Sequence, residues 1–136
     1  MKRYGIATAV TALVAALTLT GSPSSAARTV PSIAGTWHGT YSSTRFNNTA
    51  GHWTAHFHQN GSHVTGTITI NPGCITQGSI NGTISGSSIS FGQVHNGSRT
   101  ISFAGTITAG GTRMHGTYHS PALCGSDHGT WRGHHA

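Results

Sequence analysis

One tripeptide recurs through the chain: glycine, then threonine, then tryptophan, tyrosine or isoleucine. In a β-strand the first and third residues of such a triplet point to one face of the sheet, and the threonine points to the other. A small inward residue beside a bulky one lets a sheet bend while its interior stays filled. The repeat therefore predicts a strongly curved β-sheet. The seven copies begin at Gly35, Gly39, Gly66, Gly82, Gly105, Gly116 and Gly129.

Alternation of apolar and polar residues predicts eight short strands, and no window shows the period of an amphipathic helix. Segments suited to tight hairpin turns separate several neighbouring strands, for example at Asn60-Gly61 and Asn96-Gly97. A slip in the alternation of the fifth strand predicts a β-bulge at Gly92. The predicted strands are residues 34–43, 52–59, 63–70, 78–84, 88–95, 100–108, 112–119 and 128–134.

Three connections are longer than a hairpin turn, namely Ser43–Gly51, Asn71–Gln77 and Ser120–Asp127. Eight strands joined in chain order, each with one apolar face, predict an all-β, eight-stranded, antiparallel up-and-down barrel. In such a meander the connections that hold Cys74 and Cys124 lie at the same end, so one disulfide between them would cross the mouth of the barrel. A two-sheet β-sandwich built from the same strands is the competing fold.

Residues 1–27 have the composition of a secretory signal peptide: two basic residues, an apolar run and a small-residue site at which cleavage is expected after Ala27 or, alternatively, after Ala26. The apolar run is too short to span a membrane. We expect residues 28–33 to form an untied N-terminal lead and residues 34–136 to form a single domain. Two cysteines in an exported chain predict one disulfide. The sequence thus predicts a secreted protein with no membrane span.

The charged residues limit the chemistry that this chain can perform. Beyond residue 27 it has five arginines, no lysine and one carboxylate, Asp127, a formal charge of +4 with neutral histidines. A single carboxylate excludes mechanisms that need two. A serine triad would need Asp127 to orient a histidine, and the adjacent His128 is poorly placed for that role. We therefore expect no enzyme, and the scattered arginines predict no nucleic-acid binding.

The inward residues determine whether the barrel is filled or hollow. Eight strands enclose just enough space for side chains or for one small ligand, and the sequence leaves both interpretations open. If a ligand binds at the mouth or in the lumen, the large inward aromatic residues are the ones that would contact it. These candidate ligand-binding residues are Trp37, Tyr41, Trp53, Phe57, Tyr118 and Trp131.

Most of the eleven histidines fall on the strand face opposite the apolar residues. His56 and His58 share one side of a strand, and His63 follows just beyond the next turn. This spacing suits imidazole ligation of Zn²⁺ or Cu²⁺. The alternative is a solvated polar face without a metal, because the chain has almost no carboxylates to orient the imidazole rings.

The sequence Gly35-Thr36-Trp37 at the start of the first strand, followed by an eight-strand meander, resembles the calycin superfamily of lipocalins and avidin-type barrels. The resemblance implies a small secreted barrel that binds a ligand. Lipocalins pair this tryptophan with an arginine on the last strand, where Arg132 is the corresponding residue. Alternation, however, points Arg132 to the other face of the sheet from its neighbour Trp131. The continuation His38-Gly39-Thr40-Tyr41 differs from the residues with which avidin-type proteins hold biotin, so biotin binding is not implied.

Three functional hypotheses follow from the sequence. The first is a secreted, non-catalytic protein that binds a small apolar ligand. The second is an interaction or inhibitor barrel that engages a secreted protein or the cell surface through the long loops Ser43–Gly51 and Ser120–Asp127. The third is extracytoplasmic binding of zinc or copper by the outward histidines. Apart from that metal, no cofactor is expected.

Overall fold

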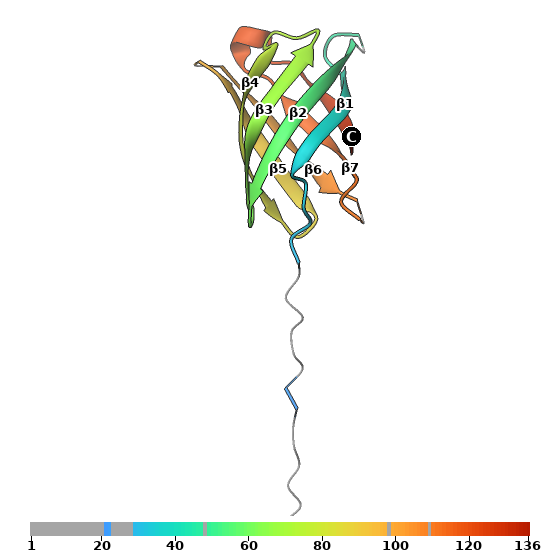
Figure 1. Cartoon of the computed structure of the whole chain (residues 1–136). Coiled ribbons are helices and arrows are strands. Elements are labelled where there is room, and N and C mark those ends of the chain that lie inside the picture. Colours follow the sequence, from blue (N-terminus) through green and yellow to red (C-terminus); the bar gives the residue numbers. More distant parts are fainter. Residues whose placement is uncertain (1–20, 23–28, 48, 98, 109) are drawn as a thin grey trace, which may run out of the picture.

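The computed structural model describes residues 21–22, 29–47, 49–97, 99–108 and 110–136, without the side chains of residues 92–95. The predicted signal peptide, residues 1–27, therefore lies outside the described residues except at 21–22. Eight strands form a closed barrel in chain order, each antiparallel to its neighbours, and β1 pairs with β8 (Figure 1). The predicted up-and-down barrel is confirmed, and the competing sandwich is excluded.

The predicted strand boundaries agree with the structure to within two residues. One short 3-10 turn, η1, lies in the connection between β7 and β8. The elements are β1 (Gly35–Ser43), β2 (Ala50–Asn60), β3 (His63–Asn71), β4 (Gln77–Ser85), β5 (Ser88–Asn96), β6 (Arg99–Ile107), β7 (Arg113–His119), η1 (Ala122–Cys124) and β8 (His128–His135).

The hairpin between β2 and β3 is displaced by one residue from its predicted position. Asn60 pairs with His63, so the turn consists of Gly61 and Ser62 rather than Asn60 and Gly61. Gly61 has a φ of 59°, as a two-residue turn with glycine at its first central position requires. The asparagine therefore ends the strand, and the glycine alone takes up the left-handed backbone conformation.

The predicted irregularity in β5 is confirmed. The pairing of β5 with β6 shifts register between Ser90 and Val94, and the pairing of β4 with β5 shifts between Asn81 and Thr83. Along β5, both shifts fall between Ser90 and Val94, the segment that contains the predicted bulge at Gly92. Such bulges increase the local twist of a strand and help a sheet to close.

The waist of the barrel is filled by aromatic side chains that lie over glycines. Gly39 and Gly133 pair where β1 meets β8, and the indole of Trp53 lies against both residues. A Cβ at Gly39 would stand 2.1 Å from Cε2 of Trp53, and one at Gly133 would stand 2.5 Å from Cη2 of the same ring. Only glycine leaves room for an indole at this position.

The same arrangement recurs on another side of the barrel. Gly105 of β6 pairs with Gly116 of β7, and a Cβ at Gly105 would stand 2.8 Å from Cζ2 of Trp131. The rings of Trp53 and Trp131 pack edge to face with centroids 6.0 Å apart, and Phe91 stacks on Phe103 at 4.8 Å. The central part of the barrel is thus a packed core of interlocking rings.

The end of the barrel opposite η1 is closed by the N-terminal lead (Figure 1). Ile33 is fully buried, its carbonyl accepts a hydrogen bond from the indole of Trp37 at 2.8 Å, and its N–H donates to Gln59 at 2.7 Å. The ring of His135 packs edge to face on Trp37 with centroids 5.3 Å apart. The expectation of an untied lead was therefore wrong, because Ile33 supplies the apolar side chain that closes this end.

The other end carries the disulfide. Cys74 in the β3–β4 connection is bonded to Cys124 in η1, with their Cα atoms 5.6 Å apart. Ile75 beside it is buried in the core. The predicted disulfide is confirmed, and it ties together two connections at the same mouth of the barrel (Figure 1).

We expect Gly133→Ala to destabilise the fold by about 1–3 kcal/mol, because its methyl group would overlap the indole of Trp53. Thr130→Ala, at an exposed position of the same strand, should cost less than about 1 kcal/mol. Denaturant unfolding measures both values. The cost of Gly133→Ala should shrink in a Trp53→Leu background. An undiminished cost there would show that the ring contact is not its cause.

Candidate functional site

A cavity of about 340 Å³ opens at the disulfide end of the barrel. Its volume lies at the lower end of the range for small-molecule sites, about 300–1,000 Å³. Most of its wall is apolar, built from the mouth ends of β3 and β6 and from the loop that carries Cys74. The apolar residues that line it are Phe46, Ile70, Pro72, Ile75, Ile101 and Phe103.

Three polar side chains meet in the wall of this cavity. The hydroxyl of Ser43 donates a hydrogen bond to Oδ1 of Asp127 at 2.5 Å, and the hydroxyl of Tyr118 donates to Oδ2 at 2.9 Å. Ser43 Oγ in turn accepts the backbone N–H of Phe46 at 2.9 Å. A buried serine, a buried tyrosine and a half-buried carboxylate thus form one connected network.

The strand register brings these three residues together. Gly129 of β8 pairs with Ser43 on one side and with Tyr118 on the other. Asp127 precedes this glycine by two residues, so it lies at the mouth end between β7 and β1. A Cβ at Gly129 would stand 1.9 Å from the carbonyl oxygen of Ser42. The close approach of β1 and β8 at this glycine therefore places the carboxylate within reach of both hydroxyls.

Tyr41 lies on the same wall as Tyr118. The two rings pack edge to face with centroids 5.7 Å apart, and the hydroxyl of Tyr41 donates to the carbonyl of Pro72. That bond links β1 to the loop that carries the disulfide. Beyond residue 27, these two are the only tyrosines in the chain. In a chain without residues 1–27, a tyrosine signal would therefore report on this cavity alone.

Burial and the neighbouring carboxylate both raise tyrosine pKa values here. Burial has the largest effect on Tyr118, followed by its hydrogen bond to Asp127 and by the negative charge of that carboxylate, so its pKa lies well above the ordinary value. Burial and the charge of Asp127 also raise the pKa of Tyr41. Both hydroxyls therefore stay protonated, and able to donate, throughout the neutral range.

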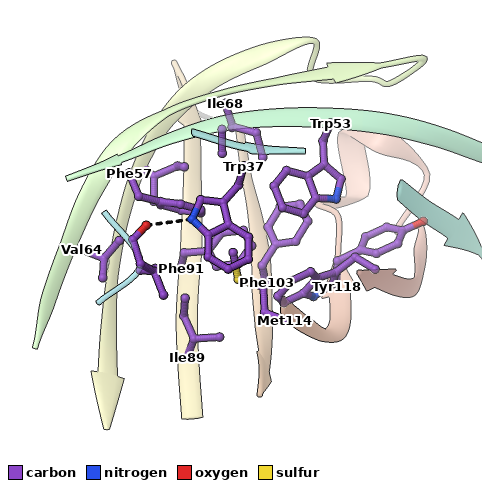
Figure 2. Packing of buried hydrophobic residues seen from close by; sticks show 14 of the residues in the cluster. Trp37, Trp53, Phe57, Val64, Ile68, Ile89, Phe91, Phe103, Met114 and Tyr118 are labelled. Carbon is purple, nitrogen blue, oxygen red and sulfur yellow. Dashed lines mark hydrogen bonds between the residues drawn. The ribbon is translucent and has the colours of Figure 1, made fainter. Parts of the chain in front are cut away.

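The six residues predicted to bind a ligand fall into two groups. Tyr41 and Tyr118 line the cavity. The other four, Trp37, Trp53, Phe57 and Trp131, are buried in the packed core below it. In Figure 2, Tyr118 lies at the edge of this cluster with its hydroxyl turned away from the other rings. As far as the described residues show, the barrel is therefore filled through its waist and hollow at one mouth.

Among the residues that the structure describes, one buried side-chain polar atom has no hydrogen-bond partner. Nε1 of Trp53 is buried and has no hydrogen-bond partner, whereas the indoles of Trp37 and Trp131 each donate to a backbone carbonyl. The nitrogen of Trp53 lies on the side of its ring toward Tyr118 in Figure 2. An unpaired buried N–H costs about 1–3 kcal/mol of folding free energy. Packing of the indole against Gly39 and Gly133 offsets this cost.

The predicted metal ligands His56, His58 and His63 are all exposed on the outer face. Nδ1 of His56 lies 3.0 Å from the hydroxyl of Thr36. Within the described ranges, no three histidine, cysteine or acidic residues are arranged to hold a metal ion. The structure therefore does not bring the three histidines together as one metal centre.

Arg132 does not lie near Trp37. It is exposed on the outer face of β8, where its Nε donates to the hydroxyl of Thr40 at 3.2 Å. The position beside Trp37 is taken instead by the ring of His135. Alternation predicted this outward orientation correctly, and the arginine–tryptophan pairing that the lipocalin resemblance implies is not formed.

Sequence reasoning did not assign Ser43, Ile75 and Asp127 to a site. Ser43 follows Tyr41 by two residues, so the alternation of β1 places it inward, but strand prediction searched only for apolar inward residues. Ile75 and Asp127 lie in loops, where alternation gives no information about side-chain direction. The signal that could have found Asp127 is its status as the chain's single carboxylate.

Comparison of the chain with protein-family models, with curated proteins and with solved structures found no match. Among the residues that the structure describes, no helix has the length and apolar character needed to cross a membrane.

We expect the free energy of unfolding to fall as the pH rises above about 10. The unfolded chain ionises its tyrosines near pH 10, while folded Tyr118 keeps its proton because its pKa is raised. Above that pH the unfolded state binds fewer protons, so alkali favours it. Denaturant unfolding between pH 9 and 11.5 should give a steeper loss for wild type than for Tyr118→Phe. An equal dependence of the unfolding free energy on pH in both proteins would contradict a raised pKa of Tyr118.

Proposed function

We propose that this protein is a secreted, non-catalytic barrel that binds one small, largely apolar molecule in the cavity at its disulfide end. The observation that carries the proposal is the cavity itself: apolar walls with a few convergent polar groups, over a core that is otherwise filled. Small-molecule sites combine these features, because apolar area supplies affinity and a few polar groups fix orientation.

The construction of the mouth supports a cavity that exists before a ligand arrives. The disulfide joins two of the rim connections, and the hydroxyls of Ser43 and Tyr118 hold Asp127 in place. A site held in its binding shape loses less conformational entropy when it binds. The disulfide also supports export, since such bonds persist mainly in oxidising compartments.

A filling substitution tests the cavity directly. We expect wild type to bind the neutral fluorescent probe N-phenyl-1-naphthylamine, and Ser120→Phe, in the cavity wall, to weaken binding by about tenfold or more by occupying that space. Ser79→Phe, the same change at an exposed outer position of β4, is the matched control and should leave binding unchanged. Fluorescence titration measures the Kd. Equal binding by all three proteins, or none by wild type, would contradict the proposal.

A second candidate function is binding of a protein partner through the rim loops. Phe46 is 46% exposed in the β1–β2 connection, and Leu123 is 73% exposed in η1. Phe46 packs near Gly125 of the β7–β8 connection, so the two loops meet at the mouth. Large exposed apolar side chains on neighbouring loops are typical of interaction sites.

The second candidate predicts inhibition rather than uptake of a ligand. In assays of a panel of secreted proteases and glycosidases, the protein should inhibit at least one enzyme. The double variant Phe46→Ser/Leu123→Ser should lose that inhibition, while Ser79→Phe, at an exposed position of β4, should keep it. Absence of inhibition across the panel, or inhibition that survives loss of both side chains, would count against the loop hypothesis.

A further inference from the structure

The single carboxylate of the chain faces this apolar cavity. Asp127 is the only acidic residue in the sequence, it lines the cavity, and it is half-buried. Both side chains that bond to it, Ser43 and Tyr118, are neutral hydroxyls. Among the described residues, no arginine or histidine forms an ion pair with it. Its negative charge therefore has no ion-pair partner within the part of the chain that the structure describes.

The carboxylate has capacity for a further partner. An ionised carboxylate offers about four acceptor positions, and the two hydroxyls occupy one on each oxygen. A charge that is partly removed from water is costly unless it is paired and hydrogen-bonded. A cationic donor inside the cavity would fill the open positions and supply the missing charge.

The rings around Asp127 also suit a cation. Tyr41, Phe103 and Tyr118 line the same cavity, with centroids 5.7 Å apart for the two tyrosines and 6.0 Å apart for Phe103 and Tyr118. The faces of aromatic rings attract cations that lie within about 6 Å of the centroid. A carboxylate beside several rings distinguishes an ammonium group from a neutral or anionic one.

We propose that the ligand of this cavity is a small organic amine. Its protonated ammonium group lies beside Asp127, and its aromatic or branched aliphatic body packs against Ile75, Ile101 and Phe103. This inference rests on the proposed binding function and adds to it the charge of the ligand.

The positive net charge of the protein repels an ammonium ligand. Arg45 lies at the rim with its guanidinium 5.7 Å from the ring centroid of Phe46, and it is exposed to water. At physiological salt, exposed charges are largely screened beyond about 8 Å. A direct hydrogen bond to Asp127 therefore outweighs the charge of an exposed arginine such as Arg45, which water and salt screen. Added salt should leave the affinity for an amine unchanged or raise it slightly.

Three probes with the same aromatic body and different charge test the inference in wild type alone. These are 2-phenylethylamine, 2-phenylethanol and 3-phenylpropionate, titrated by calorimetry at pH 7. A charge-assisted hydrogen bond predicts that the amine binds about 10- to 100-fold more tightly than the alcohol. The carboxylate should bind most weakly of the three, although the net charge of the protein attracts it.

Variants then separate the local contact from net charge. Asp127→Asn should remove the preference for the amine over the alcohol. Adding Asn81→Asp, on the exposed face of β4, restores the net charge without restoring the site, so the preference should stay lost. If Asp127→Asn does not fold, the order of affinities of the three probes for wild type still tests the amine inference.

The outcomes distinguish this inference from the binding function beneath it. If the amine and the alcohol bind equally and Ser120→Phe abolishes both, the cavity binds ligands but Asp127 only braces the rim, and the amine inference is overturned. Amine preference that survives Asp127→Asn also overturns it. If none of the three probes binds and N-phenyl-1-naphthylamine does not bind either, the proposed function itself fails.

Discussion

Contact between one indole and two glycines determines how this barrel closes. Trp53 lies over Gly39 and Gly133, which pair with each other where the first strand meets the last. A side chain at either glycine would push the indole out of the core or separate the closing strands. Of these three residues, Gly39 belongs to a Gly-Thr triplet, as do Gly105 and Trp131 of the second contact, so the repeat supplies part of this ring-over-glycine packing.

Because the waist is filled in this way, the described residues leave a cavity at one end of the barrel. Ile33 and His135 cover the end beneath Trp37. The opposite end has the longer connections. The disulfide joins two of them, and the hydrogen bonds to Asp127 join β1 and β7 to the β7–β8 connection beside the cavity. The cavity thus follows from an asymmetry between short turns at one end and long, cross-linked loops at the other. Both functional proposals concern that end, one through its cavity and one through its rim.

Strands, core and disulfide were predictable because they depend on alternation and topology. Strict period-2 patterning fixes which residues face inward, and a meander fixes which connections share an end. Loop residues carry no such periodicity, so the inward directions of Ile75 and Asp127 could not be foreseen. Ile33 was missed because a residue outside any strand can be buried only by tertiary packing. The ligand prediction relied on ring size, which selects the largest core residues and not the smaller side chains that border an open space.

The most direct test of this account locates a bound molecule by nuclear magnetic resonance. With methyl-labelled isoleucines and N-phenyl-1-naphthylamine, we expect nuclear Overhauser contacts from the probe to Ile75 and Ile101 at the mouth. We expect none to Ile84 and Ile89, which pair near the β4–β5 turn at the opposite end. Contacts confined to the outer face of the barrel, or a saturated complex without contacts to the cavity isoleucines, would contradict the claim that this cavity is the binding site.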